Sequence, residues 1–338
     1  MALVYTAPGE IELLELPMPK PGADEVLIKV AWCGICGSEV ESFVSGRRRK
    51  PPLIMGHEFS GIVADVGHGV SGFEVGERVV VNPLISCGEC RLCMRGFENV
   101  CHQRKLLSMH RPGGYAEYVS VPRQCVFKLP SMLDLKLAAL SEPLANAVHA
   151  CRLARTNGFN SVVIIGAGTI GLLCLQVVKR FDGITVVVID PVEQRREVAK
   201  SLGAEVAIDP NEVDVSGLVS DLTHGVGADV CFDAVGKSET RALSCKLLSP
   251  KGIAVWIGLH DADALIDGAC IVTGEKRIQG SYAYTRGDFE AAIKLLCDEH
   301  VQVHGWVSEV PLREAREAFL SLAYGDLERI KVLINCSK

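Results

Sequence analysis

Four cysteines stand close together in the segment C-G-E-C-R-L-C-M-R-G-F-E-N-V-C, which spans 87–101. Spacing of this kind lets one loop wrap a single ion, and Zn²⁺ in closed structural sites takes four tetrahedral thiolates. The alternative interpretation is two disulfides or unreactive buried thiols. We predict a structural zinc lobe over 87–101, held by Cys87, Cys90, Cys93 and Cys101. Few folds carry such a lobe.

The bulk properties of the chain narrow its class. Its 338 residues, of which 48% are hydrophobic, suffice for two domains of ordinary size. A net charge of −6 gives no basic field, so we expect no nucleic-acid partner. Residues 1–21 lack a basic region followed by an apolar run, and no stretch reaches the roughly 18 apolar residues of a membrane span. With 14 cysteines suited to a reducing compartment, we expect a cytoplasmic protein with no membrane partner.

The sequence pattern of the N-terminal part of the chain is typical of a compact β domain. Short β-branched runs alternate there with Gly and Pro, which is typical of a barrel-like fold. The runs predict strands at 26–31, 60–66, 78–81 and 115–121. Apolar residues at helical spacing then predict a single helix over 135–154.

Further along, apolar strands alternate with helices, a pattern that indicates a parallel sheet covered on both faces. We expect strands at 162–165, 185–189, 206–208, 229–234 and 253–259, and helices at 169–180, 192–202, 215–223 and 238–248. From 288 onward, two more helices and a closing strand at 330–334 are expected.

A glycine-rich turn follows the first of these strands. The sequence G-A-G-T-I-G at 166–171 matches G-x-G-x-x-G in the required place, after a strand and at the start of a helix. Such glycines allow a tight turn and a close approach to a pyrophosphate, and the free N–H groups of the helix N-terminus favour its charge. The expected contacts are Gly166, Gly168, Thr169, Ile170 and Gly171. A glycine hinge in a purely structural sheet is the alternative.

Cofactor preference is indicated by Asp190, which ends the next strand. A carboxylate there accepts hydrogen bonds from the ribose hydroxyls and repels a 2′-phosphate, so NAD is favoured over NADP. Arg195 and Arg196 could instead hold that phosphate, although we expect them to lie along the adenosine or in solvent.

Three further candidates have ordinary explanations when taken alone. The pair Cys33 and Cys36 could be a redox couple. His57 and Glu58 in G-H-E-F-S-G could be satisfied polar residues, and Glu142 in S-E-P-L could belong to a turn.

Taken in order, however, C-G-I-C-G-S, G-H-E-F-S-G, the four-cysteine lobe, G-G-Y-A-E-Y and G-A-G-T-I-G resemble the zinc-dependent medium-chain dehydrogenase/reductase family over nearly the full length. The likeness is to its alcohol and polyol branch, which includes sorbitol dehydrogenase-like enzymes. It implies a mixed α/β and β fold: a GroES-like catalytic domain at 1–145 and a Rossmann NAD-binding domain with a doubly wound parallel sheet at 146–283. A C-terminal segment at 284–338 would return to the catalytic domain.

The resemblance also implies a second zinc, making two per chain. The catalytic ion would be held by Cys36, His57 and Glu58, with Glu142 as a ligand directly or through water. Ser38 would relay the substrate proton, and Cys33 would be a small core residue. Two positions depart from the family pattern, since Glu39 replaces an aspartate that supports the histidine and Glu41 replaces a relaying histidine.

The implied reaction moves hydride between NAD and a small polyol, sugar alcohol or other secondary alcohol, giving the ketone. E-P-L at 142–144 favours polyols, whereas L-A-N-A-V-H-A and R-P-G are also similar to threonine dehydrogenases, so an L-threonine 3-dehydrogenase is the alternative. A non-catalytic zinc-binding structural protein is disfavoured because every ligand is kept.

Two surface features stay open. The basic run at 47–50 is either a solvated loop or a contact for an anion such as a phosphorylated polyol. The segments 262–273 and 278–284 are where family members pair subunits, which implies a homo-oligomer, a tetramer rather than a dimer. The alternative for 262–273 is an ordinary surface loop of a monomer.

Overall fold

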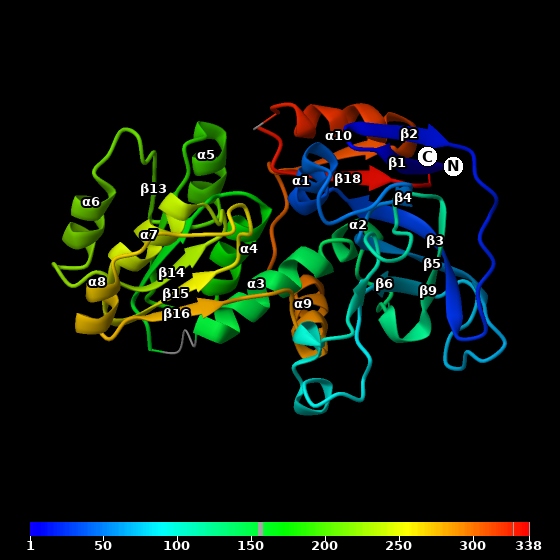
Figure 1. Cartoon of the computed structure of the whole chain (residues 1–338), viewed down its shortest axis with the longest axis horizontal. Helices are drawn as coiled ribbons and strands as arrows, with labels where there is room; N and C mark the ends of the chain where they lie inside the picture. The colour runs from blue at the N-terminus through cyan, green and yellow to red at the C-terminus, as the bar shows by residue number, and fades with distance from the viewer. Residues whose placement is uncertain (155–157, 327, 338) are drawn as a thin grey trace. The chain divides into compact units, whose positions relative to one another are not determined.

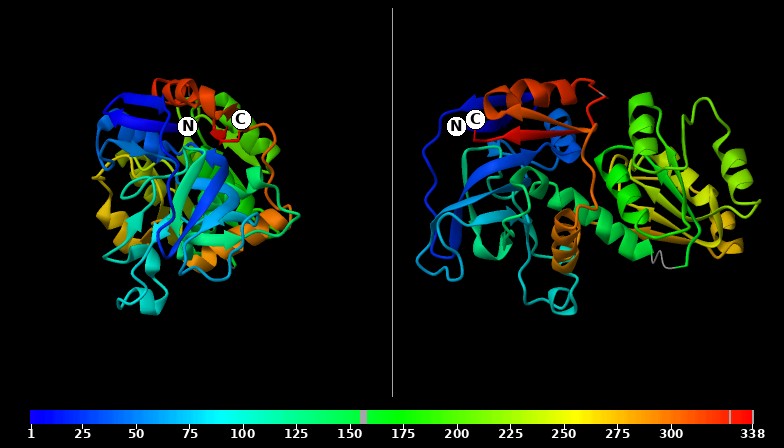
Figure 2. Two further views of the ribbon diagram at one scale, coloured as in Figure 1. Left: turned by 90° about the vertical axis from the view of Figure 1, so that its right-hand side faces the viewer. Right: turned by 180° about the vertical axis from the view of Figure 1, so that it is seen from behind.

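The computed structural model describes residues 1–154, 158–326 and 328–337. The chain divides into two compact units. The first comprises Met1–Glu142, Thr285–Glu299 and Trp306–Lys338, and the second comprises Pro143–Tyr284 and His300–Gly305. The division therefore falls slightly before the expected boundary at 145, and 300–305 belongs with the second unit. Both ends of the chain lie in the first unit, near each other in all the views of Figures 1 and 2.

The first unit is built on a seven-stranded sheet in the order β10-β6-β5-β3-β18-β17, with β9 also paired to β3. Its strands are β3 (Glu25–Gly34), β5 (Glu58–Val66), β6 (Arg78–Val81), β9 (Tyr118–Pro122), β10 (Val126–Lys128), β17 (Val307–Pro311) and β18 (Lys331–Asn335). Strand β18 runs antiparallel to β3, so the C-terminal segment completes a sheet that the N-terminal part begins.

Two helices close the core of this unit over the sheet. Val26, Ile28 and Val30 pack into the core cluster from one face of β3, and Leu27 on the other face is also buried. Phe43 of α1 (Gly37–Ser45) packs edge-on against Phe319 of α10 (Ala315–Ala323), with ring centroids 5.3 Å apart. This contact anchors α1, whose first turn follows Cys36.

Smaller elements complete the first unit. The hairpin strands β1 (Ala2–Ala7) and β2 (Glu10–Leu14) form a three-stranded sheet with β4 (Leu53–Ile54). Strands β7 (Leu84–Ile85) and β8 (Lys105–Leu106) pair at the base of the 87–101 segment, which holds the 3-10 turns η1 (Cys93–Arg95) and η2 (Glu98–Val100). Helix α9 (Arg286–Cys297) and the turns η3 (Arg123–Cys125) and η4 (Leu312–Glu314) belong here too.

The second unit holds a six-stranded parallel sheet in the order β13-β12-β11-β14-β15-β16. In sequence this order is 3-2-1-4-5-6, the Rossmann arrangement. The strands are β11 (Ser161–Ile165), β12 (Thr185–Ile189), β13 (Val206–Ile208), β14 (Ala228–Asp233), β15 (Leu248–Trp256) and β16 (Arg277–Gly280).

Helices cover both faces of this sheet (Figure 1). Val162, Val163, Ile164 and Ile165 are all buried, as in a strand with no solvent face. The helices are α4 (Thr169–Val178), α5 (Glu193–Ser201), α6 (Val215–Leu222), α7 (Ser238–Lys246) and α8 (Gly268–Thr273). The predicted fold class, a β-rich domain and a domain with a doubly wound parallel sheet, is confirmed.

Several predicted elements differ in detail. The single helix expected over 135–154 is two helices, α2 (Leu135–Ala138) and α3 (Ser141–Ala154). Pro143 explains the break, because it has no N–H to donate to the carbonyl of Ala139 and its ring would clash with that carbonyl. Pro143 is tolerated in the first turn of α3, where its missing N–H needs no partner, but not in the interior of a helix over 135–154.

Other predicted strands are misplaced at their ends. The strand expected at 115–121 begins only at Tyr118. The strand expected at 253–259 is β15, which begins earlier, at Leu248, and ends at Trp256. The strand expected at 278–284 is β16, which ends already at Gly280. Strand β17 was not expected at all. The segment 262–273 is not wholly loop, because α8 occupies its second half.

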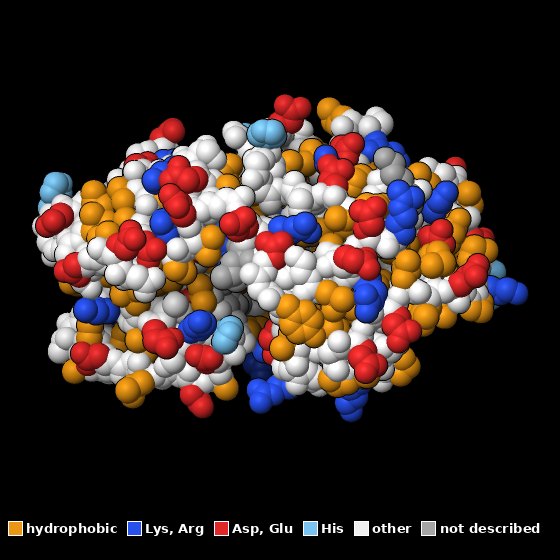
Figure 3. All heavy atoms as spheres, turned by 90° about the horizontal axis from the view of Figure 1, so that it is seen from above, with side chains coloured by type: hydrophobic (Ala, Val, Ile, Leu, Met, Phe, Trp, Pro, Cys, Tyr) orange, Lys and Arg blue, Asp and Glu red, His pale blue; other side chains and the backbone are white. Residues whose placement is uncertain are grey.

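Two surface properties are plain. None of the helices in the described part of the chain combines the length and apolar character that a membrane-spanning segment requires. In Figure 3, acidic and basic side chains are interspersed over the face that is shown.

Candidate metal centres and cofactor site

The four cysteines of the 87–101 lobe converge on one point. Their sulfurs lie 3.5 Å apart between Cys90 and Cys93 and between Cys101 and Cys87, and 3.8 Å apart between Cys87 and Cys93 and between Cys90 and Cys101. Four sulfurs placed about 2.3 Å from a central zinc would be about 3.8 Å apart. The cage therefore fits Zn²⁺ closely.

The four thiols of this cluster influence one another's ionisation. The backbone N–H of Cys93 lowers the pKa of the Cys90 thiol to about 6. Burial, followed by the hydrogen bond with Cys90, raises the pKa of Cys93 to about 12. Once one thiolate has formed, its neighbour is held as a thiol. A positive ion among the four sulfurs would favour the thiolate form of all of them.

A second group of ligand atoms gathers Cys36, His57 and Glu58 within 4.8 Å of one another. Cys36 immediately precedes α1, and Glu58 is the first residue of β5, where it pairs with Gly34 of β3. His57 and Glu58 are buried, and Cys36 is half-buried. A thiolate, an imidazole and a carboxylate with a fourth position open form the donor set of a catalytic zinc.

His57 is supported by the carboxylate of Glu39, which is fully buried. Its Oε1 lies 3.0 Å from His57 Nδ1 and accepts a hydrogen bond of 2.7 Å from the backbone N–H of Gly56. Ser108 Oγ donates to the same oxygen, and Tyr115 donates its hydroxyl to Oε2. A carboxylate behind a metal-binding histidine fixes the ring and its tautomer. The hydroxyl groups of Ser108 and Tyr115 thus help to hold the longer glutamate in place.

Opposing effects set the charge states of this pair. Burial alone would raise the pKa of Glu39, but the charge of His57 and the surrounding hydrogen bonds hold it well below its usual range. Burial would lower the pKa of His57, yet the charges of Glu39 and Cys36 raise it well above its usual value. The raised pKa of His57 favours its protonated form when no metal is bound.

Arg49 is the exception within the basic run at 47–50, whose other three residues are exposed as a solvated loop would have them. Its side chain is buried and is committed to neighbouring oxygens: Nε donates to the carbonyl of Ser108 at 2.7 Å, and Nη1 donates to the carbonyl of Ser38 at 2.8 Å. Ser108 itself has the left-handed φ of 68°, which non-glycine residues rarely adopt. Arg49 is thus neither solvated nor open to a phosphate, whereas Arg47, Arg48 and Lys50 are exposed.

A buried lysine completes the second metal group. Lys331 of β18 donates to Glu58 Oε2 and, at 2.9 Å, to the carbonyl of Ile35. Burial would lower its pKa, but the charges of Glu58, Cys36 and Glu142 raise it. The cation neutralises part of the negative charge that a thiolate and two carboxylates bring to one site.

The remaining predicted residues of the first unit lie around this group. Ser38 Oγ donates to Cys36 Sγ at 3.4 Å and accepts from Arg49 Nη2 at 3.4 Å. Glu142 is buried in the first turn of α3 but is not among the three ligands that share the 4.8 Å cluster. Glu41 is half-buried and accepts from Ser45 at 3.1 Å.

In the second unit, the glycine-rich turn leaves room where a pyrophosphate would lie. Gly166 has φ of 94°, and a Cβ there would lie 2.6 Å from a methyl of Val235. A Cβ on Gly171 would lie 1.8 Å from the carbonyl oxygen of Gly166, so only glycine lets α4 approach its strand. A Cβ on Gly168 would meet nothing within 4 Å. The N-cap residue of α4 is Gly168, which has no side chain to cap the helix, and the first helical residues are Thr169 and Ile170.

Asp190 stands beside this turn at the end of β12. Its two oxygens accept hydrogen bonds from Ala167 N at 2.7 Å and Val192 N at 2.9 Å, and each keeps a lone pair. Arg195 Nη1 lies 4.0 Å from Asp190 Oδ2, whereas Arg196 donates to Asp209 at 3.2 Å. The turn and its carboxylate fit a dinucleotide.

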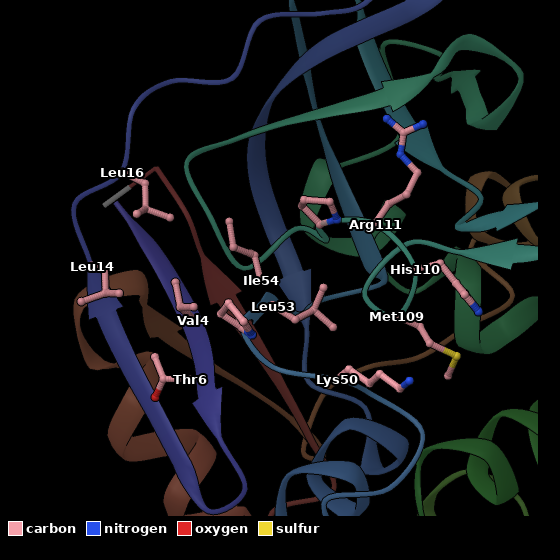
Figure 4. A pocket seen from close by; sticks show the side chains of 12 residues that line it. Val4, Thr6, Leu14, Leu16, Lys50, Leu53, Ile54, Met109, His110 and Arg111 are labelled. Atoms are coloured by element: carbon pink, nitrogen blue, oxygen red, sulfur yellow. The ribbon is translucent and has the colours of Figure 1, made fainter.

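An open pocket of about 580 Å³ in the first unit has none of the candidate metal ligands or cofactor-binding residues in its lining. Figure 4 shows side chains from the N-terminal hairpin, such as Val4 and Leu14, and from the 109–112 loop, such as Met109 and His110. Size alone therefore does not mark the functional site.

Sequence reasoning missed Lys331, Arg49, Ser108 and Tyr115. The sequence holds one signal for Lys331: it is a charged residue in the otherwise apolar strand segment K-V-L-I. Arg49 could not be told apart from the basic residues on either side of it, which are exposed. Tyr115 lies in the motif G-G-Y-A-E-Y, which did not indicate its contact with Glu39, and Ser108 lies in a segment with no polar pattern.

Comparison with known proteins places the chain. The family model described as "Alcohol dehydrogenase GroES-like domain" matches residues 22–131, and "Zinc-binding dehydrogenase" matches 169–298. A sorbitol dehydrogenase of Halalkalibacterium halodurans is 35% identical over 98% of both chains. An L-threonine 3-dehydrogenase of Pyrococcus horikoshii is 40% identical over 79% of this chain and 78% of its own.

Among solved structures, a zinc-binding dehydrogenase from Sinorhizobium meliloti 1021 bound to NADP superposes with a TM-score of 0.92 at 31% identity, covering 99% of this chain and 98% of its own. Together with the fitting donor sets, these matches make zinc and a nicotinamide dinucleotide the cofactors of this chain. The chain belongs to the zinc-dependent medium-chain alcohol and polyol dehydrogenases.

Proposed function

We propose that the chain oxidises a polyol, a sugar alcohol or another small secondary alcohol to the ketone, with NAD as hydride acceptor. The observation that carries this proposal is the group Cys36, His57 and Glu58, in a chain that also has a dinucleotide turn. Three ligands suit a catalytic zinc, and the four cysteines of the lobe suit a second, structural one.

The first unit would prepare the proton transfer. When bound, zinc would polarise the substrate hydroxyl and the nicotinamide would take the hydride. Ser38 would relay the hydroxyl proton, releasing its own Oγ proton toward solvent as it accepts, since its Oγ lies 3.4 Å from the ligand sulfur of Cys36 and is oriented by Arg49. Glu39 would hold His57 in place through the reaction, and Lys331 would hold Glu58. We propose Glu142 as an additional ligand, direct or through water.

NAD, rather than NADP, is the proposed cofactor. Asp190 is buried beside the glycine turn, and its charge opposes a 2′-phosphate. Arg195 is the competing influence, because an arginine can hold that phosphate and one solved relative binds NADP. We give Asp190 more weight than Arg195 because its carboxylate accepts a hydrogen bond from the backbone N–H of Ala167, within the turn itself.

The substrate class rests on the sorbitol dehydrogenase match, which spans 98% of both chains. L-Threonine stays the second candidate because of the 40% identity to a threonine dehydrogenase. The test is NAD⁺ reduction by the zinc-loaded protein with sorbitol, galactitol, galactitol 1-phosphate, xylitol, 2,3-butanediol and L-threonine. Turnover of a polyol or diol supports the proposal, and turnover of threonine alone would replace it with the second candidate.

A homo-oligomer in the cytoplasm is part of the proposal. All fourteen cysteines are free thiols, as expected in a reducing compartment. Met94 and Phe97 on the zinc lobe, and Ile278 on the edge strand β16, are exposed apolar residues that subunit contacts would cover. Light scattering of the zinc-loaded protein would show a tetramer, and a monomeric mass would contradict this part of the proposal.

A further inference from the structure

Arg195 and Arg196 are neighbours in the first turn of α5, but the structure pairs them with different carboxylates. Arg195 Nη1 lies 4.0 Å from Asp190 Oδ2. Arg196 Nη1 donates instead to Asp209 Oδ2 at 3.2 Å and to the backbone carbonyl of Asp190 at 2.9 Å. Two cations close to one cofactor-binding carboxylate are therefore held apart, and Asp209 holds the second of them.

Asp209 lies at the same edge of the parallel sheet as Asp190. It directly follows β13, which pairs with β12, and the backbone N–H of Asp190 donates to the carbonyl of Ile208 at 3.1 Å. Ligands of a Rossmann sheet bind outside the carboxyl ends of its strands, where both aspartates stand. Strand β13 forms the edge of the sheet opposite to β16, so subunit contacts along β16 would not cover this ion pair.

The carboxylate of Asp209 is fixed on both of its oxygens. Oδ1 accepts hydrogen bonds from the backbone N–H and the side-chain amide of Asn211, both at 2.9 Å, and Oδ2 is left to Arg196. The side chains of Arg196 and Asp209 are only 14% and 13% exposed. A pair so little exposed is screened less by salt than a surface pair, so Arg196 has little reason to leave it.

We propose that Asp209 is a specificity-determining residue for the cofactor, because it holds Arg196 away from a 2′-phosphate on the adenosine ribose. This inference rests on the proposed preference for NAD. Asp190 opposes the phosphate by its own charge, whereas Asp209 acts through Arg196, whose planar fork of N–H donors matches phosphate oxygens. Without the Asp209 carboxylate, the guanidinium loses its partner and a 2′-phosphate can supply a new one.

The test measures the Kd of NADH and of NADPH by the fluorescence of the reduced nicotinamide, with the zinc-loaded protein and no alcohol. Asp209→Asn keeps the shape of the side chain and removes its charge. It should lower the Kd of NADPH by about tenfold and change the Kd of NADH by less than about twofold. Asp209→Glu keeps the charge and should keep the wild-type ratio. An unchanged ratio of the two Kd values in Asp209→Asn would overturn the proposal.

A double variant shows whether the effect passes through Arg196. Asp209→Asn, Arg196→Met removes both charges of the pair, so NADPH should bind about as weakly as it binds to the wild type. If the double variant binds NADPH as tightly as Asp209→Asn does, Asp209 acts by its own charge and not by holding Arg196. Glu212→Gln removes an exposed carboxylate nearby in the chain and should leave the ratio unchanged. An equal effect of Glu212→Gln would also contradict the proposal.

The wild-type protein tests the proposed cofactor preference in the same titrations. Tighter binding of NADPH than of NADH would contradict the preference for NAD, whereas the change of the ratio in Asp209→Asn decides the role of Asp209 in either case. Because no alcohol is present, the result does not depend on which substrate the protein oxidises.

Discussion

The ammonium of Lys331 donates to the carboxylate of Glu58, a residue 273 positions earlier in the chain. Both side chains are almost fully buried, at 1% and 2% exposure. A buried charge without a partner is costly, so each side chain depends on the other. The last strand of the chain therefore contributes directly to the environment of a candidate zinc ligand.

Replacing Lys331 with Met should destabilise the zinc-free protein by about 3–5 kcal/mol, because Glu58 is left as a buried charge with no cation. With zinc bound the loss should be smaller, since the ion can compensate the carboxylate. Denaturant unfolding with and without chelator measures both values.

Lys128→Met is the matched control for this comparison. Lys128 pairs with Glu77 at the surface, where an ion pair is worth about 0–1 kcal/mol. If Lys331→Met costs no more than Lys128→Met in the zinc-free protein, the buried pair does not have the role assigned to it.

Removing the hydroxyl of Tyr115 should weaken the metal site. Tyr115→Phe takes one donor from Glu39, which supports His57, so we expect zinc affinity at this site to fall by about 10–100-fold. The lobe zinc should be unaffected. Competition with a fluorescent chelator measures the two affinities separately.

Tyr5→Phe provides the matching control, because the buried Tyr5 hydroxyl has no hydrogen-bond partner among the described residues. Its loss should leave zinc affinity unchanged. Equal effects of the two substitutions would mean that Tyr115 acts only through packing.

Acid stability should depend on Glu25, far from either metal group. Burial alone would raise its pKa, but hydrogen bonds from Ser120 and Gly22 and the charge of Arg111 hold the pKa below its usual value. A lowered pKa stabilises the folded state above the unfolded pKa of about 4.3, and this contribution is lost as pH falls through the folded pKa.

Glu25→Gln should therefore be less stable than the wild type at neutral pH, and the difference should shrink toward about pH 3. Free energies of unfolding at several pH values measure it, with the exposed Glu10→Gln as control. A difference that stays constant or grows in acid would have the wrong sign for this account.

Cofactor preference should respond to Asp190. In Asp190→Ser the ratio of kcat/KM for NAD over NADP should fall about tenfold or more, equivalent to about 1.4 kcal/mol, because the repelling charge is gone and Arg195 becomes free to hold the phosphate. The double variant Asp190→Ser, Arg195→Met should lose that gain with NADP. If the ratio does not move in Asp190→Ser, the preference lies elsewhere.

Local spacing explains what could be predicted from the sequence. The cysteines of the lobe, the glycines at 166–171 and the alternation of strands and helices each lie within a short stretch of chain. The parallel sheet follows from the alternation, because each strand needs a crossover helix to reach the next.

Long-range relationships explain what could not be predicted. Lys331 reaches Glu58, and Arg49 reaches Ser108, only after the sheet has formed. Tyr115 was read as a strand residue, but it turns into the core and reaches Glu39. The helix expected over 135–154 failed for a local reason that periodicity does not detect, the missing N–H of Pro143.

The most direct test of the central claim joins zinc content to hydride transfer. We would measure zinc per chain and NAD⁺ reduction, with the best alcohol of the panel, for the wild type and for Cys36→Ser. The account predicts about two zinc ions per chain in the wild type, and about one, with activity lost, in the variant. Full activity with unchanged zinc content in Cys36→Ser would contradict it.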